Sequence, residues 1–285
     1  MMKPLEGKVA LVTGAGSKRS MGHAAALRLA KEGAKVVVVD KEPAPKSVWP
    51  GDEDWGGLSD IVKEIESLGS EGLAIVADIS RSEDVERMVF EALNRFGKID
   101  ILVHCAAIRG PMNTPLIEHD EATWRKTLDV NVTGTFLVCK AVAKAMLKDG
   151  KSEGRKIVLF GSLAGVGGYP GSAAYCASKH AVAGLGKTLA LELAKYKINV
   201  NIIHPGAVAT NLRDENIRQR AKDEGVSLAE VVEKTRKQEA ELASKIPLGR
   251  MGTPEDIANV VFFLVSNQSE WLTGIEIPVA GGSRG

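Results

Sequence analysis

Short apolar runs, which suit buried strands, alternate with longer helix-favouring segments along almost the whole chain of 285 residues. Helices between strands imply parallel pairing, and right-handed crossovers then place helices on both faces of the sheet. The alternation therefore predicts a doubly wound, Rossmann-type α/β fold: a seven-stranded parallel sheet in a single domain, 1–285. The strand-like runs are KVALVTG, AKVVVVD, GLAIVAD, IDILVHCAA, RKIVLFGS, KINVNIIHPG and TGIEIPVAGG.

The segments between these runs are expected to be helices. Segment 21–33 is rich in alanine and leucine and stops at Gly33, as helices often do. Ser80 and Glu83 have the spacing of a capping box, which predicts that a helix opens there. Further helices are expected over 58–69, Glu121–Leu147, Ala173–Ala194, 212–244 and 254–266.

Composition excludes several classes of partner. A net charge of +1 gives no electrostatic case for nucleic acid or for a membrane surface. No apolar run approaches a membrane span, and the strand pattern begins so early that we expect no signal peptide. Cys105, Cys139 and Cys176 lack metal-ligand spacing, which indicates reduced thiols in a cytoplasmic protein and no metal site.

The ends of the strand-like runs carry the residues that could bind a ligand. In doubly wound folds, ligands lie beyond the carboxyl ends of the strands. If the fold is right, these residues therefore share one edge of the sheet. They are Gly14, Asp40, Asp78, Ala106, Ser162 and Pro205.

A glycine-rich turn, TGAGSKRSMGHA, joins the first strand to the first helix. Such a turn lets the backbone approach a pyrophosphate at a helix N-terminus. Gly14, Gly16 and Gly22 do not have the usual G-x-G-x-x-G spacing, so an ordinary turn is the alternative. Asp40 ends the second strand, where an acid suits the ribose hydroxyls of NAD and could equally cap the strand. Together the two features predict a dinucleotide site.

Tyr175 stands four residues before Lys179 in GSAAYCASKHA, so both side chains share one face of the expected helix. A phenol is a poor base near neutral pH, and a nearby ammonium lowers its pKa toward the working range. The pair predicts proton transfer by Tyr175. A chance pair is the alternative, which other motifs must exclude.

Those motifs resemble the short-chain dehydrogenase/reductase family over nearly the whole chain. The glycine turn is similar to the family's T-G-x-x-x-G-x-G, NVTG to its N-x-x-G, and HPGAVAT to its P-G-x-V-x-T. Ser162 lies thirteen residues before Tyr175, the usual family interval. Asp78 resembles the family's adenine-contacting aspartate. Several motifs in the family order remove the chance reading of the tyrosine and lysine.

The resemblance implies a role for each matched residue. Ser162 would hydrogen-bond the substrate oxygen, Lys179 would grip the nicotinamide ribose, and Asn131 would position a water behind that lysine. A buried asparagine bridging helix and sheet is the alternative for Asn131. The implied catalytic residues are Asn131, Ser162, Tyr175 and Lys179. The implied cofactor-binding residues are Gly14, Gly16, Ser20, Met21, Asp40, Asp78, Ile79, Ala106, Tyr175, Lys179, Pro205, Val208 and Thr210.

The resemblance also implies the reaction: a secondary alcohol and a ketone are interconverted by hydride transfer with NAD, and Tyr175 is the general acid/base. Asp40 favours NAD because a carboxylate repels the 2′-phosphate of NADP, although Lys18, Arg19 and Lys41 lie close by in the sequence. A homotetramer is implied as well. The alternative functions are a non-catalytic NAD-binding redox sensor and an enoyl-thioester reductase.

The sequence departs from the family pattern at three places. HCAA replaces the family's N-N-A-G, which leaves the packing beside the fourth strand open. The glycine turn is longer than usual, carries Ser20 in place of a glycine, and resembles that of divergent enoyl-thioester reductases. Those enzymes have six residues between tyrosine and lysine; here that position is Val182, which favours carbonyl and alcohol chemistry. Segment 41–57 is an insertion, expected as a cover near the adenosine end or as a plain surface loop.

Three further features concern the substrate. Segment 211–245, which is helix-favouring with balanced charges, is expected to form a lid. Arg109 could meet an anionic substrate group, although a solvated loop arginine is the favoured interpretation. His204 is expected to be a strand-end histidine bonded to backbone.

Overall fold

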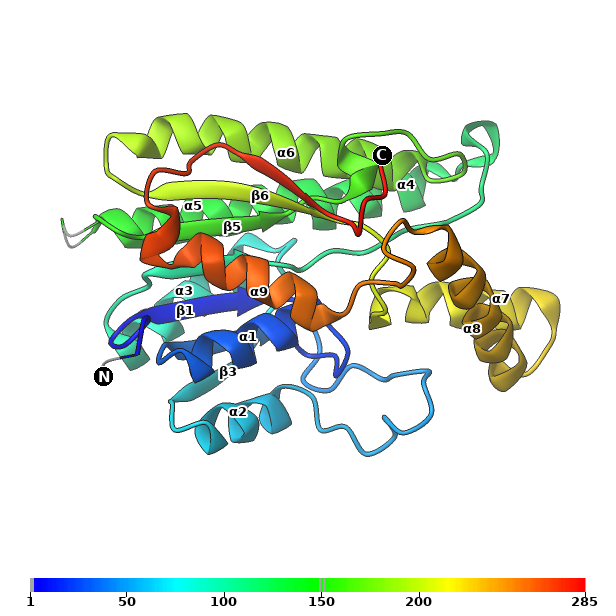
Figure 1. The fold of residues 1–285 in the computed structure, drawn as a ribbon, viewed down its shortest axis with the longest axis horizontal. Coiled ribbons are helices and arrows are strands. Elements are labelled where there is room, and N and C mark those ends of the chain that lie inside the picture. The colour runs from blue at the N-terminus through cyan, green and yellow to red at the C-terminus, as the bar shows by residue number, and fades with distance from the viewer. Residues whose placement is uncertain (1–2, 149, 151, 285) are drawn as a thin grey trace.

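The computed structural model describes residues 3–148, 150 and 152–284, and within them one sheet has the strand order β3-β2-β1-β4-β5-β6-β7. Every neighbouring pair is parallel, so the predicted seven-stranded parallel sheet is confirmed. The carboxyl ends of the strands meet at one edge (Figure 1). The strands are β1 (Val9–Thr13), β2 (Lys35–Asp40), β3 (Gly72–Val76), β4 (Ile101–His104), β5 (Lys156–Phe160), β6 (Asn199–Pro205) and β7 (Glu276–Val279).

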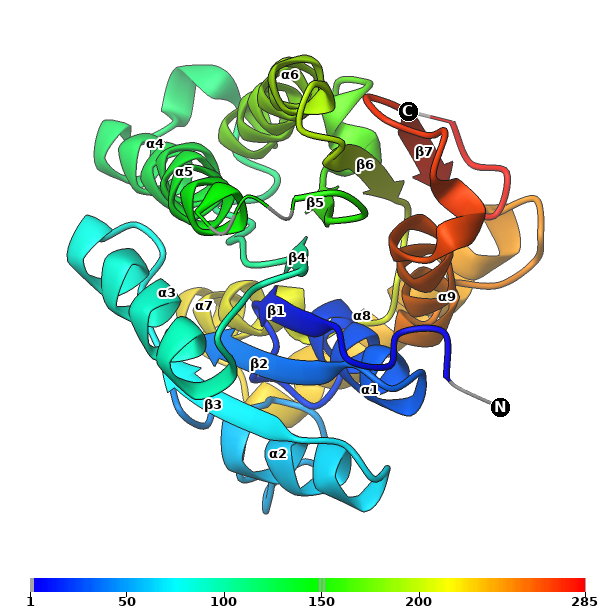
Figure 2. The ribbon, with the colours of Figure 1, turned by 90° about the vertical axis from the view of Figure 1, so that its left-hand side faces the viewer.

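Helices cover both faces of the sheet (Figure 2). Each face has its own apolar core, since side chains of a strand alternate between the two faces. One core is closed by α1 (Met21–Lys31), α2 (Leu58–Ser67) and α9 (Pro254–Val265). The other is closed by α3 (Ser82–Phe96), α5 (Gly134–Leu147) and α6 (Ala173–Ala194).

The long helix expected over Glu121–Leu147 is interrupted. It consists of α4 (Glu121–Leu128), a π-helical turn (Asp129–Thr133) and α5. The wider turn contains Asn131, and π-helical turns inside α-helices are frequent at functional sites. The sequence prediction of one regular helix missed this turn.

The same stretch is the one place in the described chain that is long and apolar enough to cross a membrane by length and composition. On that criterion, the expectation that no run reaches the length of a span is wrong. Val138, Val142 and Met146 of α5 are nevertheless fully buried in the core, which is the behaviour of a core helix.

The predicted capping box of Ser80 and Glu83 is wrong. Helix α3 begins at Ser82, and Arg81 at its N-cap position makes no side-chain cap. The Ser80 hydroxyl instead donates to Asp78 Oδ1 at 2.6 Å. This charge-assisted hydrogen bond holds the Ser80 side chain against the carboxylate that follows β3, and the helix begins two residues later.

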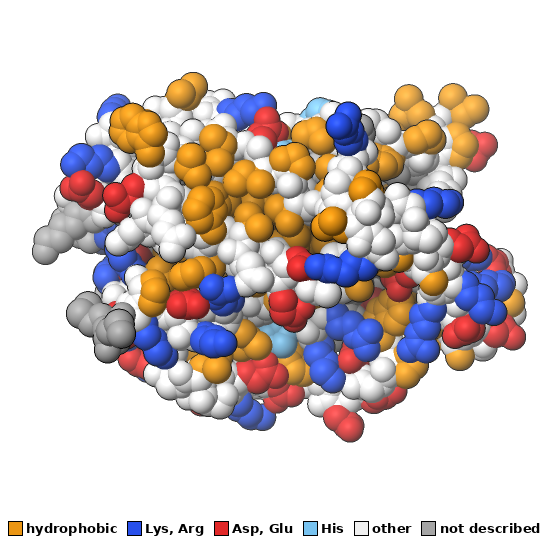
Figure 3. All heavy atoms as spheres, in the orientation of Figure 1, with side chains coloured by type: hydrophobic (Ala, Val, Ile, Leu, Met, Phe, Trp, Pro, Cys, Tyr) orange, Lys and Arg blue, Asp and Glu red, His pale blue; other side chains and the backbone are white. Residues whose placement is uncertain are grey.

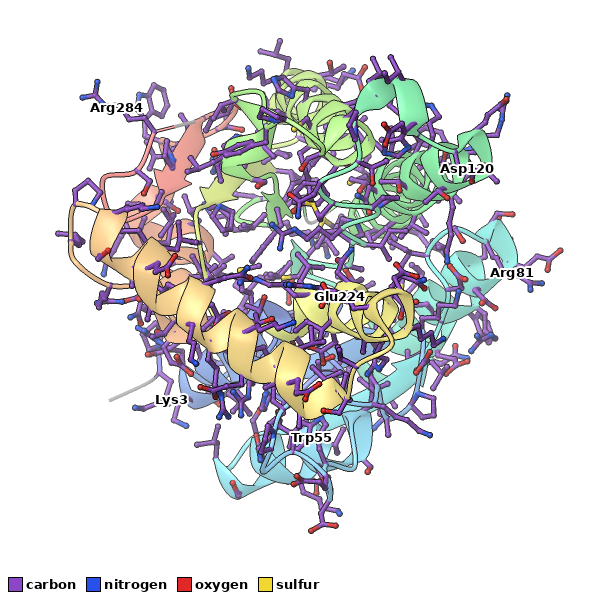
Figure 4. The ribbon with its side chains drawn as sticks, turned by 90° about the vertical axis from the view of Figure 1, so that its right-hand side faces the viewer. Lys3, Trp55, Arg81, Asp120, Glu224 and Arg284 are labelled. Atoms are coloured by element: carbon purple, nitrogen blue, oxygen red, sulfur yellow. The ribbon has the colours of Figure 1, made fainter. Side chains whose placement is uncertain are left out.

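Segment 41–57 packs against a helical hairpin formed by α7 (Asp214–Glu224) and α8 (Leu228–Lys245). Val48 and Trp49 from the segment form a small separate core with three hairpin side chains: Ile217, Val231 and Val232. Viewed onto the carboxyl ends of the strands, α8 crosses the front, Glu224 ends α7, and Trp55 lies beneath (Figure 4). The segment therefore has an apolar anchor, which a plain surface loop would lack.

Candidate active site

Tyr175 and Lys179 lie on the first turns of α6, on one face as the spacing predicts. The ammonium nitrogen of Lys179 is 5.7 Å from the centroid of the Tyr175 ring and donates to the Phe160 carbonyl at 2.8 Å. Lys179 is buried, with 4% of its surface exposed, whereas Tyr175 is half-buried. The carbonyl at the end of β5 thus fixes a buried ammonium beside the phenol.

Ser162 follows β5 and reaches the same phenol. Its side chain lowers the pKa of Tyr175 as a hydrogen-bonding neighbour, and it accepts from the Ala164 amide at 3.2 Å. Its backbone is held by His204, whose Nδ1 lies 2.7 Å from the Ser162 carbonyl oxygen and whose Nε2 lies 2.8 Å from Glu276. His204 is therefore a buried strand-end residue bonded to backbone, and it fixes the position of Ser162.

Burial dominates the electrostatics of the pair. It lowers the pKa of Lys179 to about 8, against a small opposing influence of Cys105. It also raises the pKa of Tyr175, although the charge of Arg109 and the hydrogen bond with Ser162 act in the opposite direction. Without a ligand, both groups are therefore displaced toward their neutral forms.

Asn131 is buried and its amide is fully used as a donor. It donates to the Ile108 carbonyl at 2.8 Å and to Ser178 Oγ at 3.0 Å, and it accepts from the Ile108 amide at 2.8 Å. These contacts tie the loop after β4 to α6. One acceptor position of the side-chain oxygen remains for the predicted water.

His104 replaces an asparagine of the family pattern. Its ring holds the elements beside β4 together, where the sequence had left the packing open. Its Nδ1 lies 2.8 Å from Thr13 Oγ1 and its Nε2 lies 3.0 Å from Thr135 Oγ1. Thr135 in turn donates to the Asn131 carbonyl at 2.6 Å. Burial lowers the pKa of His104 to about 3, so the ring is neutral at pH 7 and joins β1, β4 and α5.

The glycine turn is close-packed where the pattern predicted. Gly14 has φ +69°, and a Cβ there would lie 2.7 Å from the Ala106 backbone. A Cβ on Gly22 would lie 2.5 Å from the Gly14 carbonyl oxygen. Ser20 caps α1 by accepting from the His23 amide at 3.0 Å, and Met21 begins the helix. The turn therefore presents a capped helix N-terminus, which fits a pyrophosphate.

Asp40 lies against this turn. It accepts from the amides of Gly16 and Lys41, each at 2.8 Å, and burial raises its pKa although these bonds lower it. Burial would also raise the pKa of Asp78, but hydrogen bonds from Ser80 and Lys41 outweigh it and the pKa is lowered. Two carboxylates thus mark the end of the sheet where the adenosine of NAD is expected.

The other predicted cofactor residues line the same edge. Ile79 is buried against Gly134, where a Cβ would come within 3.0 Å of its side chain. Pro205 ends β6, Val208 bridges to Gly252, and Thr210 is 92% buried, with 8% of its surface exposed. Asn131, Tyr175 and Lys179 lie on helical segments, and Met21 begins α1. The other predicted site residues are at the carboxyl ends of the strands or in the turns that follow them.

The sequence did not reveal a hydrogen-bonded group of polar residues around Asn211, between the glycine turn and the hairpin. The Asn211 side chain accepts from the Arg19 amide at 2.9 Å and donates to Ser47 and Asp214 at 3.0 and 2.9 Å. Asp214 also accepts from the Trp49 indole at 2.9 Å. The two tryptophans of segment 41–57 were the available signal, because exposed tryptophans are uncommon in a plain surface loop.

Segment 41–57 also engages the bases of the glycine turn. Arg19 and Lys18 pair with Asp52 at 3.0 and 3.4 Å, and the Trp55 indole donates to the Gly16 carbonyl at 2.8 Å. Lys41 pairs with Asp78 at 2.9 Å. All three bases that could have met a 2′-phosphate therefore have acidic partners.

The chain has extensive similarity to known proteins. A family model described as Enoyl-(Acyl carrier protein) reductase matches residues 14–284. The chain is 34% identical to 3-oxoacyl-(acyl-carrier-protein) reductase FabG of Thermotoga maritima over 98% of both chains. It is 35% identical to dehydrogenase/reductase SDR family member 4 of Oryctolagus cuniculus, over 98% of this chain and 95% of the relative.

A solved structure extends the likeness to the fold. An NAD+-bound xylitol dehydrogenase superposes with a TM-score of 0.81 at 33% identity, over 98% of this chain and all of the other. Sequence similarity over nearly the full length and the same sheet architecture agree with the site geometry. The chain belongs to the short-chain dehydrogenase/reductase family of oxidoreductases.

Proposed function

We propose that the protein is an NAD(H)-dependent oxidoreductase that interconverts a secondary alcohol and a ketone, with Tyr175 as general acid/base. One observation carries this proposal: the Ser162 side chain neighbours the Tyr175 phenol, and the buried Lys179 ammonium lies beside the same ring. The close-packed glycine turn and Asp40 fit NAD on the same edge of the sheet. The NAD+-bound state of the xylitol dehydrogenase and the reductase name of the bacterial relative support this chemistry.

When bound, the nicotinamide would supply the hydride acceptor or donor. In alcohol oxidation, Tyr175 takes the hydroxyl proton while Ser162 holds the substrate oxygen by a hydrogen bond. Lys179, fixed by the Phe160 carbonyl, would hold the ribose and keep a positive charge beside the ring. Its lowered pKa also suits it to pass a proton onward near neutral pH. The reverse direction reduces the ketone.

NAD is the preferred cofactor in this proposal. Asp40 opposes a 2′-phosphate, and Lys18, Arg19 and Lys41 are already engaged with Asp52 and Asp78. An unpaired like-charge contact at close range costs several kcal/mol, so Asp40 dominates.

The hairpin α7–α8, with the turn that precedes it, would act as the predicted lid over 211–245. It lies at the carboxyl edge of the sheet and is attached to segment 41–57 by the small apolar core. Segment 41–57 would then serve as a cover that links the lid to the glycine turn.

One alternative function has specific support. The description of the matching family model names an enoyl-thioester reduction, and the long glycine turn agrees with it. Against it, the lysine stands four residues after the tyrosine, and Val182 occupies the position that this reductase class would need. A non-catalytic redox sensor has no use for Ser162 and Lys179 arranged around the phenol.

A homotetramer in a reducing, cytoplasmic compartment is part of the proposal. Apolar side chains gather on the face that carries β7 and α9 (Figure 3), and Trp271 and Phe263 are 97% and 37% exposed. Phe136 on α5 and Leu191 on α6 are 46% and 80% exposed. Such surfaces suit contacts between copies of the chain. The three cysteines are free thiols, as expected in that compartment.

The test is a screen of secondary alcohols with NAD and of the matching ketones with NADH, followed by the absorbance of reduced nicotinamide. Turnover of an alcohol–ketone pair is the expected result. Reduction of an enoyl thioester without turnover of any such pair would favour the reductase alternative. NADH binding without any turnover would favour the sensor.

A further inference from the structure

The loop after β4 carries Arg109 into the substrate side of the site and is held rigidly on both sides of it. Ile108 exchanges two hydrogen bonds with the side chain of Asn131, both at 2.8 Å. Gly110 accepts from the Asn216 side chain of α7 at 3.0 Å, and its φ of +66° and contact with Thr127 exclude a side chain there. The backbone of Arg109 is therefore fixed between the predicted catalytic asparagine and the hairpin.

The same loop packs against the segment that leads to Tyr175. The Thr114 amide donates to the Gly171 carbonyl at 3.3 Å, and Ser172 Oγ lies 3.4 Å from Met112 Sδ. A Cβ on Gly171 would lie 2.6 Å from the Asn113 backbone. Arg109 thus belongs to a wall of the site that is preorganised before any ligand arrives.

Within the described residues, Arg109 makes no hydrogen bond or ion pair, although it is half-buried. Its charged neighbour Arg213 is already paired with Glu239 at 3.0 Å in a mostly buried contact. Burial and the like charge of Arg213 lower the pKa of Arg109, whereas Tyr175 acts in the opposite direction, and no carboxylate is among the groups that act on it. A half-buried guanidinium beside another one is unfavourable unless an anion joins it.

We propose that Arg109 binds an anionic group of the substrate, a carboxylate on the same molecule as the reacting alcohol or ketone. This inference rests on the proposed function and narrows its substrate class to hydroxy acids and keto acids. A guanidinium forks onto a carboxylate with two parallel hydrogen bonds, which fixes orientation as well as affinity. The loop that carries Arg109 packs against Gly171 and Ser172, just before Tyr175, and the charge of Arg109 acts on that phenol, so an anion bound to Arg109 would lie on the reacting side of the site.

The test compares acids with their methyl esters, which differ only in the charge at issue. The substrates are 3-hydroxybutyrate and 4-hydroxypentanoate, each with its ester, and the measured quantity is the ratio of kcat/KM for acid over ester. Both members of a pair use Tyr175, so any change in its pKa on mutation cancels in this ratio. The parent should prefer the acid of at least one pair.

Arg109→Gln should lower that ratio by about 10- to 100-fold, the usual worth of charge-assisted hydrogen bonds. Arg109→Lys keeps the positive charge but cannot make the two parallel hydrogen bonds, so its acid-to-ester ratio should lie between those of the parent and Arg109→Gln. Arg220→Gln is the matched control, because it makes the same change on α7, where the arginine already has an acidic partner, Glu224, at 2.5 Å. It should leave the ratio at the parent value.

Two results would overturn the inference. One is an acid-to-ester ratio that Arg109→Gln does not change. The other is a loss of NADH affinity in Arg109→Gln, measured by fluorescence titration, with the ratio unchanged, because the anion would then be a cofactor phosphate. If neither acids nor esters turn over, the screen of secondary alcohols and ketones described above decides the proposed function separately. Calorimetry of acetoacetate and its methyl ester on the NADH complex then decides the inference: acid-selective binding lost in Arg109→Gln supports it, and equal binding of both contradicts it.

Discussion

The carboxyl edge of the sheet carries two groups of cationic side chains, which differ in whether they have acidic partners. At the glycine turn, Lys18 and Arg19 share Asp52, and Lys41 pairs with Asp78. At the substrate end, Lys179 and Arg109 have no acidic partner within the described residues, although both are more deeply placed than Lys18. Lys179 meets one carbonyl oxygen, and Arg109 meets no hydrogen-bonding group of the described chain.

The presence or absence of an acidic partner separates cations that stabilise the fold from cations that are available to bind a ligand. Asp52 has only 2% of its side chain exposed, so its two bases keep a buried carboxylate satisfied and fasten segment 41–57 to the glycine turn. An unpaired buried cation has the opposite effect, because it weakens the free protein and gains its partner only in the complex. We therefore expect removal of a cation at the substrate end to impair reaction or selectivity without lowering the stability of the free protein, and removal of a cation at the glycine turn to lower that stability.

The largest expected effect is that of Tyr175→Phe, which removes the transferable proton and almost no volume. Turnover should fall by about 10² to 10⁴, the usual worth of a general acid/base, while NADH still binds. Steady-state rates and fluorescence titration of NADH measure the two effects. Tyr196→Phe is the control, because Tyr196 is at the far end of α6 and 40% exposed. Near-normal turnover in Tyr175→Phe would remove the basis of the proposed mechanism.

A smaller effect is expected from Trp49→Ala, which empties the small core between segment 41–57 and the hairpin. Loss of a buried aromatic costs about 3 kcal/mol, so the undocked hairpin should become roughly 100-fold more populated. Limited proteolysis should then cut 211–245 faster, and NAD with substrate should slow the cutting.

Trp271→Ala is the matched control for this experiment, since that indole is 97% exposed. It should leave the rate of cleavage unchanged. First cleavage outside 211–245, or cleavage that ignores ligands, would contradict the assignment of the hairpin as a lid.

The smallest effect concerns cofactor choice at the glycine turn. The parent should prefer NAD over NADP by at least about tenfold in kcat/KM, which needs about 1.4 kcal/mol. Asp40→Ala should narrow this preference, and Asp40→Arg should reverse it by supplying a base without an acidic partner. Lys18→Ala should change it little, because Lys18 is engaged with Asp52. A preference for NADP in the parent, or one indifferent to residue 40, would contradict this account.

The parts of the site that depend on short-range patterns were predictable from the sequence. Strand and helix periodicity gave the sheet, and helix geometry put Tyr175 and Lys179 on one face. The glycine turn followed from the local need for close backbone approach, and Gly14 and Gly22 have that packing. In each case the local sequence pattern determines the local geometry, even where the contact itself is to a distant residue, as between Gly14 and Ala106.

The parts that depend on distant partners were not predictable. Asn211 lies 192 residues from Arg19 and 164 from Ser47, and no periodicity connects them. The π-helical turn at Asn131 leaves no pattern in a segment that otherwise favours helix. Arg109 was expected to be solvated because one sequence does not show that Arg213 and Tyr175 lie around it.

The contrast between paired and unpaired cations is tested most directly by urea unfolding of two single variants, Lys179→Met and Arg19→Met, beside the parent. The Lys179 pKa falls from 10.5 to about 8 on folding, so the folded state disfavours the charged form. Its destabilising effect is full below pH 8 and is lost as pH rises toward 10.5, where the unfolded chain also releases its proton. Arg19→Met is the comparison, because Arg19 has an acidic partner, Asp52, at 3.0 Å.

At pH 7, Lys179→Met should be more stable than the parent by on the order of 2 to 4 kcal/mol, and this gain should shrink between pH 8 and 10.5. Arg19→Met should be less stable than the parent by about 1 kcal/mol at every pH in the range, because Lys18 still pairs with Asp52. A Lys179→Met variant that is less stable than the parent at pH 7, or a gain that does not change with pH, would contradict the account of an unpaired cation held for a ligand.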